Sequence, residues 1–190
     1  MESIIIELEK DILNNRLDIV SVLRKGHVIA SKLGLEEFDT WINKELNGYS
    51  GTDNIPNYRV VRGSLVAKNP YRGWIPVIMR NDEISENLCR RTITNSILEL
   101  ADLASLQEGE LVMRLSPEVQ QLLNNSFDTS TFFECAIIMP KTAVKDIIQK
   151  VKNALLEWCI RLESNGIFGN GFVFTPEEKE VAASKMQKKI

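Results

Sequence analysis

The single histidine is the first residue to consider as a source of acid–base or metal chemistry. His27 stands within a helical pattern, beside Lys25 and Gly26. A multi-histidine metal site needs more than one histidine, and a Ser-His-Asp or Cys-His arrangement would depend on His27 alone. We therefore expect His27 to be a partly exposed side chain on the surface of a helix.

The three cysteines are the only candidate thiol nucleophiles. Cys89, Cys135 and Cys159 are far apart in sequence and outside any C-x-x-C spacing, whereas zinc and redox sites commonly pair cysteines at that spacing. Cys135 and Cys159 also lie in apolar patterns, where cysteine behaves as a small hydrophobic residue. We expect three reduced, unpaired cysteines, as in a cytoplasmic protein.

Two further patterns could suggest chemistry. Residues 166–171, Gly-Ile-Phe-Gly-Asn-Gly, are rich in glycine as phosphate-binding loops are, but they match neither known phosphate motif and follow a helix pattern. Glu108 and Glu110 flank Gly109, a spacing that fits exposed turn residues as well as an acid–base pair. We assign no catalytic, cofactor-binding or metal-binding residue, and we expect no cofactor.

Positive charge is concentrated between residues 55 and 80. The whole chain has a formal net charge of −3, yet the five charged residues of this stretch are all basic, which leaves −8 for the rest. These residues are Arg59, Arg62, Lys68, Arg72 and Arg80. One interpretation is solvated side chains that keep strand edges from pairing with other chains. The other is an anion- or partner-binding surface, with Arg59, Arg62, Tyr71, Arg72 and Trp74 as candidate residues.

The same stretch has the densest turn chemistry of the chain. Asn69–Gly73 predicts a turn, because proline fixes its own φ and glycine accepts a positive φ. This turn separates two predicted strands, Tyr58–Ala67 and Trp74–Met79. Pro76 cannot donate a ladder hydrogen bond, which predicts an edge strand or a bulge. Apolar residues on both faces of the second strand predict that it is covered on both sides. This pattern favours Trp74 as a core residue, whereas the binding-surface interpretation makes it a contact residue.

Helical patterns bracket these strands. The predicted helices are 3–13, 18–33, 36–47, one marked by Ile93, Ile97, Leu100 and Ala104, and 142–163. Residues 116–117 and 175–178 are typical of helix starts, the latter as a capping box with proline at the first helical position. Further strands are expected at Glu110–Leu115 and Phe132–Met139. The sequence predicts an α+β fold in which helices at both ends flank a small, mainly antiparallel sheet.

Length and composition limit the class of protein. The 190 residues suffice for a single domain, with a helical part at 1–50, a strand-containing part at 55–140 and C-terminal helices at 141–190. A pI near 5.4 does not support a general nucleic-acid binder. The longest apolar run is too short to cross a bilayer, and the N-terminus lacks the pattern of a signal peptide. We expect a soluble cytoplasmic protein with no membrane partner.

Two strings are more specific than the patterns above. Residues 41–49 read Trp-Ile-Asn-Lys-Glu-Leu-Asn-Gly-Tyr, and residues 69–76 read Asn-Pro-Tyr-Arg-Gly-Trp-Ile-Pro. Together with Leu23–Gly26, Ala30–Leu35, Ile55–Arg59, Gly63 and Val151–Glu163, they resemble the AbiTii domain family over nearly the whole chain. The family is named for bacterial abortive-infection, phage-resistance systems. No catalytic motif comes with the resemblance, and none is transferred.

Two hypotheses on function are therefore open. The resemblance implies an antiviral-defence module that acts by self-association or by binding a defence-system protein, without catalysis of its own. The alternative is a nuclease, a nucleotide-processing enzyme or a small-ligand sensor that uses the basic cluster from Arg59 to Arg80. The enzymatic alternative requires acidic metal ligands that converge from distant positions, which sequence spacing cannot reveal.

Overall fold

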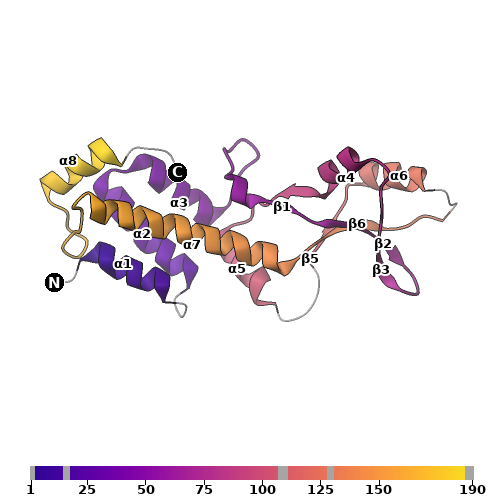
Figure 1. Cartoon of the computed structure of the whole chain (residues 1–190), viewed down its shortest axis with the longest axis horizontal. Helices are drawn as coiled ribbons and strands as arrows, with labels where there is room; N and C mark the ends of the chain where they lie inside the picture. The colour runs from indigo at the N-terminus through magenta and orange to yellow at the C-terminus, as the bar shows by residue number, and fades with distance from the viewer. Residues whose placement is uncertain (1–2, 15–17, 107–110, 128–130, 187–190) are drawn as a thin grey trace. The chain divides into compact units, whose positions relative to one another are not determined.

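The computed structural model describes residues 3–14, 18–106, 111–127 and 131–186 (Figure 1). Within these residues the predicted α+β fold is confirmed, with helices at both ends and small antiparallel sheets in the middle of the chain. The chain divides into two compact units. Unit 1 comprises residues 1–54, 94–102 and 145–190, and unit 2 comprises residues 55–93 and 103–144.

Unit 1 is helical. Its helices are α1 (Ile4–Leu13), α2 (Ile19–Leu33), α3 (Glu36–Asn47), most of α5 (Ile97–Ser105), most of α7 (Lys141–Ser164) and α8 (Pro176–Lys185). Helix α2 begins at an Asp18 cap, whose carboxylate accepts from two backbone N–H groups, and it ends at Gly34 with a φ of 70°. No helix of the described ranges is long and apolar enough to cross a membrane.

The predicted apolar stripe of α7 forms the core of unit 1. Ile147, Val151, Leu155 and Leu162 are fully buried. Gly26 of α2 lies so close to this stripe that an added Cβ would come within 3.0 Å of Leu155 Cδ1. A side chain at position 26 would therefore require Leu155 to shift.

Residues 41–49 form the inner face of α3 and the segment that follows the helix. Trp41, Ile42, Glu45 and Tyr49 are buried. The Tyr49 hydroxyl donates to Glu45 Oε1 at 2.6 Å, and the Tyr49 N–H donates to the Thr94 carbonyl at 2.8 Å. Because a buried carboxylate needs hydrogen-bond donors, the tyrosine and the glutamate of this string depend on each other.

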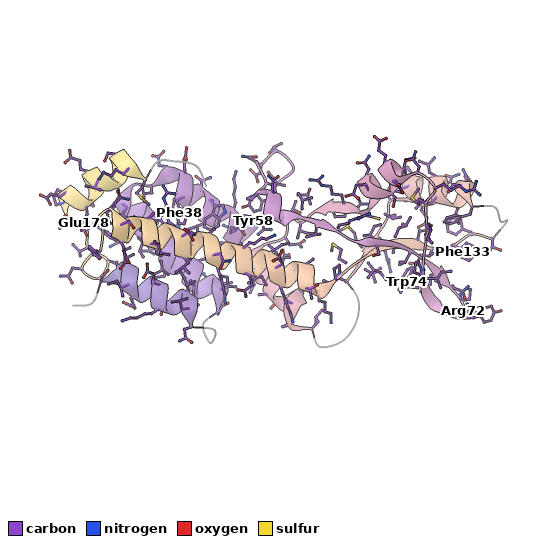
Figure 2. All side chains as sticks on the ribbon, viewed as in Figure 1. Phe38, Tyr58, Arg72, Trp74, Phe133 and Glu178 are labelled. Carbon is purple, nitrogen blue, oxygen red and sulfur yellow. The ribbon has the colours of Figure 1, made fainter. Side chains whose placement is uncertain are left out.

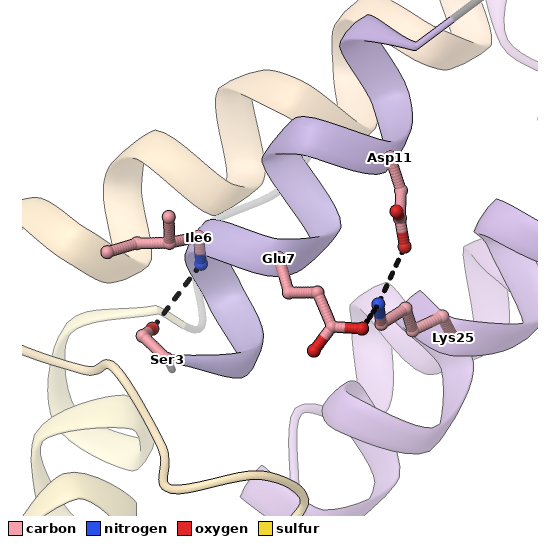
Figure 3. A network of polar contacts seen from close by, with 5 residues as sticks. All are labelled: Ser3, Ile6, Glu7, Asp11 and Lys25. Carbon is pink, nitrogen blue, oxygen red and sulfur yellow. Dashed lines mark hydrogen bonds and ion pairs between the residues drawn. The ribbon is translucent and has the colours of Figure 1, made fainter. Parts of the chain in front are cut away.

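A lysine joins α1 to α2. Lys25 Nζ lies 2.6 Å from both Glu7 Oε1 and Asp11 Oδ2, which are one helical turn apart on α1 (Figure 3). Burial alone would lower the pKa of Lys25, but the hydrogen bonds to the two carboxylates outweigh it and raise that pKa above its ordinary value. The lysine therefore stays charged while its side chain is mostly buried.

Unit 2 is built on a four-stranded antiparallel sheet in the order β3-β2-β6-β5. Its strands are β3 (Gly73–Pro76), β2 (Ser64–Asn69), β6 (Cys135–Met139) and β5 (Leu111–Arg114). A second ladder pairs β1 (Val60–Arg62) with β4 (Arg90–Thr92). Helices α4 (Asp82–Cys89) and α6 (Pro117–Ser126) supply Cys89 and Leu123 to a core built on Leu65, Cys135 and Ile137.

Pro76 lies on an edge strand, as predicted. Val77 N donates to Leu65 O at 3.0 Å, and Ile75 stands opposite Ala67. Because ladder hydrogen bonds alternate along an antiparallel pair, the backbone nitrogen of Pro76 faces away from β2. The proline, which has no N–H, therefore occupies a position where β2 does not require a backbone donor.

Two strand predictions are corrected here, and one strand was not predicted. The strand predicted at Tyr58–Ala67 is interrupted: a 3₁₀ turn (Asn57–Arg59) precedes β1, and Gly63 separates β1 from β2. The strand at Trp74–Met79 is shorter and is covered on one face only, since Ile78 on the other face is 94% exposed. Strand β4 was not predicted, because its sequence, Arg-Arg-Thr, has no apolar alternation.

The strand expected at Phe132–Met139 begins only at Cys135. The N–H of Phe133 donates to Asn124 Oδ1 at 2.7 Å, and its carbonyl accepts from the side chains of Asn124 and Gln120. Amide side chains of α6 thus satisfy the backbone where a neighbouring strand would otherwise pair with it. Strand β5 matches the remaining prediction, except that Glu110 lies outside the described residues.

The backbone of Gly63 lies directly against strand β6. An added Cβ would overlap Ile137 Cγ2 and would lie 2.8 Å from the carbonyl oxygen of Ile138. Gly63 N donates to the Cys89 carbonyl at 2.9 Å, so its backbone is held from the side of α4 as well. The position has no room for any side chain.

We predict that Gly63→Ala destabilises the protein by about 1–3 kcal/mol, because a carbonyl oxygen of β6 cannot move aside as a flexible side chain can. Thermal denaturation followed by circular dichroism measures the change. Gly51→Ala is the matched control, since nothing lies within 4 Å of its added Cβ. Equal melting temperatures for the two variants would contradict the prediction.

Candidate functional site

The predicted turn forms the end of the β2–β3 hairpin, here called the hairpin tip (residues 69–74). Asn69 Oδ1 accepts from the N–H of Tyr71 at 2.9 Å and from the N–H of Arg72 at 3.1 Å. Gly73 follows with a φ of 72°. Such side-chain-to-backbone bonds hold a turn in one conformation, so the tip presents its side chains from a fixed backbone.

Figure 2 shows Arg72 at the end of the β2–β3 hairpin. Tyr71 is 96% exposed, and Arg72 is exposed without an ion-pair partner among the described residues. Trp74 is half-buried on the outer face of β3, where Lys68 Nζ lies 5.7 Å from the centre of its ring. Tyr71, Arg72 and Trp74 are thus brought together with Lys68, at one end of unit 2.

The other two candidate arginines lie elsewhere. Arg59 is fully buried, and its Nη1 donates to the Ile93 carbonyl at 3.1 Å. Because its side chain has no exposed surface, Arg59 is not part of an exposed binding surface. Arg62 is exposed on β1 and forms an ion pair with Glu86 at 3.0 Å. The basic stretch is therefore not one patch in space.

The glycine-rich loop at residues 166–171 binds a carboxylate of its own chain. Glu178 Oε1 accepts from the N–H groups of Phe168 and Gly169, each at 2.8 Å, and Glu178 Oε2 accepts from Thr175 N at 2.8 Å. Thr175 Oγ1 in turn accepts from Glu178 N, which completes the predicted capping box of α8. The N–H groups of Phe168 and Gly169 are thus already bound to this carboxylate and are not open to a phosphate.

The protonation of Glu178 follows from these contacts. Burial raises the pKa of its carboxyl, but the backbone N–H groups of Gly169, Thr175 and Phe168 outweigh burial and lower the pKa below its usual value. Glu178 is therefore a charged structural group at neutral pH. The sequence predicted its capping role, but its bonds to Phe168 and Gly169 have no local signal, because ten and nine residues separate the partners.

Glu108 and Glu110 lie outside the described residues, whereas His27 and the three cysteines are placed as expected. His27 Nδ1 lies 2.6 Å from Asp39 Oδ1 on the surface of α2, with 37% of its side chain exposed. Cys89, Cys135 and Cys159 are free and buried. Burial raises the pKa of the Cys135 thiol, and burial followed by the charges of Glu9 and Glu163 raises the pKa of the Cys159 thiol.

A metal-dependent alternative requires converging ligands. Within the part of the chain that the structure describes, no group of three or more His, Cys, Asp or Glu side chains is placed to hold a metal ion. The hairpin tip gathers exposed aromatic and basic side chains instead.

Comparison with known proteins gave one finding. A family model described as AbiTii matches residues 3–187. Comparisons with curated proteins and with solved structures found no match. The matched range includes both units, the hairpin tip and the string at residues 41–49.

We predict that Glu178→Gln destabilises the protein by about 1–2 kcal/mol at pH 7, because the amide can replace only part of the carboxylate's accepting capacity. The folded pKa of Glu178 is lowered, so its contribution is complete above the unfolded value of about 4.3 and is lost as pH falls through the folded pKa. The difference in melting temperature between wild type and Glu178→Gln should therefore shrink below about pH 4.

Glu177→Gln is the control for that measurement. Glu177 is exposed in the same first turn of α8, and the substitution removes the same charge near the helix N-terminus. If the two variants melt alike at pH 7, the hydrogen bonds of Glu178 to the loop do not contribute as argued.

We predict that thiol reagents modify Cys135 and Cys159 slowly in the native protein and rapidly after unfolding, because the thiolate is the reactive form and both thiols are buried. Intact-mass analysis under native and denaturing conditions counts the labels. Rapid native labelling of either residue, or a disulfide between any two cysteines, would contradict this expectation.

Proposed function

The chain belongs to the AbiTii family, and from that premise we propose that it is a defence module that binds another protein through its hairpin tip. Family membership points to abortive-infection defence. The mode of action is our proposal: binding without catalysis, in the bacterial cytoplasm. The observation that carries it is a 96% exposed Tyr71 on a turn that its own Asn69 holds rigid.

The residue types at the tip support a protein partner. Tyrosine, tryptophan and arginine are the side chains most often found to dominate the binding energy of protein interfaces. Tyrosine provides a large contact area with few rotatable bonds, so ordering it on binding costs little entropy. The Asn69 hydrogen bonds reduce the cost further, because the backbone of Tyr71 and Arg72 is fixed before any partner arrives.

Charge indicates what kind of surface would receive the tip. Arg72 is exposed and unpaired within the described residues, and Lys68 lies beside Trp74. Glu134, 3.6 Å from Lys68, offsets part of this positive charge. An acidic protein surface fits such a tip, since an exposed guanidinium can form paired hydrogen bonds with carboxylates.

We predict that Tyr71→Ala/Arg72→Ala abolishes phage protection when it is expressed with the rest of its defence system, while the protein stays folded. Both side chains are exposed and neither packs in the core, so the melting temperature should change little. Plaque counts measure protection, and circular dichroism measures folding.

The matched control is Ile78→Ala/Arg80→Ala. It removes an equally exposed apolar side chain, 94% accessible, and an exposed arginine from the same unit but outside the tip. The control should protect like wild type. Full protection by the Tyr71/Arg72 variant, or equal loss in the control, would disprove the proposal. An enzymatic function would be indicated if the purified protein cleaved nucleic acid or nucleotide and one acidic substitution removed that activity without unfolding it.

A further inference from the structure

Unit 1 contains a groove with an apolar floor and an acidic rim. It is lined by Gly34, Leu35, Glu36, Glu37, Phe38 and Met186, and it encloses about 310 Å³. Leu35, Phe38 and Met186 are buried, whereas both glutamates are exposed. We call these residues the acidic groove. It lies where the start of α3 faces the residue that follows α8.

The floor of the acidic groove is rigid. The ring of Phe38 stacks on Trp158 of α7, with 4.0 Å between ring centres and an angle of 9° between the planes. Phe38 also contacts Trp41, at 5.0 Å between centres. The small exposed part of Phe38 that lines the groove is therefore held in place by the core.

The rim of the groove keeps its negative charge available. The first turn of α3 carries Glu36, Glu37 and Asp39. Asp39 pairs with His27 at 2.6 Å. Glu36 and Glu37 have no ion-pair partner within the described residues. Two carboxylates of the rim are thus open to a cation that comes from another molecule.

The two units differ in charge. Unit 1 has 14 basic and 18 acidic residues, a formal net charge of −4, and unit 2 has nine basic and eight acidic residues, a net charge of +1. The exposed hairpin tip of unit 2 bears Arg72 and Tyr71, whose chemistry complements the acidic rim and the apolar floor of the groove. Both surfaces are present on every copy of the chain.

We propose that the hairpin tip of one copy docks in the acidic groove of a second copy. This inference rests on the proposed function and names the partner. Tyr71 would cover the apolar floor, and the Arg72 guanidinium would bind the carboxylates of Glu36 and Glu37 in charge-assisted hydrogen bonds. Because tip and groove are different surfaces, such contacts join copies head to tail, and they give a ring if the rotation closes and a filament if it does not.

Two variants of the full chain test the inference together. The tip variant is Tyr71→Ala/Arg72→Ala, and the groove variant is Glu36→Gln/Glu37→Gln. In sedimentation equilibrium, wild type should show a mass that rises with concentration, and each variant alone should self-associate at least about tenfold more weakly. An equimolar mixture should form a one-to-one dimer that grows no further, because only one intact tip and one intact groove remain per pair.

The control for lost charge is Glu177→Gln/Glu180→Gln, which removes two exposed carboxylates of α8 and should associate like wild type. Circular dichroism establishes that each variant is folded; if the groove variant is not, Glu37→Gln replaces it. A wild type that stays monomeric at all concentrations, or a mixture in which no dimer forms, overturns the inference.

Failure of this inference is distinguishable from failure of the proposed function. If the tip variant loses phage protection while wild type is monomeric and the groove variant protects normally, the tip binds a different protein and the proposed function stands. If the tip variant protects normally, the proposed function fails, whatever the state of association. If both variants lose protection, and neither associates alone but their mixture forms a dimer, the proposed function and this inference are both supported.

Discussion

The close approach of the Gly63 backbone to β6 is the constraint on which unit 2 depends. Strand β2 lies in the middle of the sheet, with β3 on one side and β6 on the other. It can begin directly after β1 only because residue 63 has no side chain to collide with Ile137 and Ile138. The N–H of Gly63 also donates to the carbonyl of Cys89, which holds the residue beside α4. The hairpin that carries Tyr71 and Arg72 continues from β2, so the direction of the tip is set at residue 63.

Local chemistry made part of the fold predictable. The Asn69–Gly73 turn, the helix starts at Ser116 and Thr175 and the edge position of Pro76 depend on residues within a few positions of one another, and all are confirmed. The α+β class followed from helical and alternating patterns for the same reason. What the sequence did not reveal depends on distant partners. Strand β4 exists because it pairs with β1, some 30 residues away in the chain.

The candidate site shows the same division. The tip could be predicted, because its turn residues and its aromatic and basic side chains are contiguous. The burial of Arg59 could not, since a 3₁₀ turn and a strand differ there only in how the chain packs. The acidic groove also has no sequence signal: it needs Met186 to come beside residues 34–38. Sequence thus identified the projecting surface, and only the fold revealed the concave one.

The orientation of Pro76 has a consequence for the behaviour of the protein at high concentration. An exposed hairpin edge is normally a template for further strands, which is how ordered aggregates nucleate. Here the open side of β3 lacks a backbone donor at the position where an incoming strand would need one. A proline at this position disfavours the addition of a further strand along the open side of β3, and thereby the growth of an ordered aggregate from this edge.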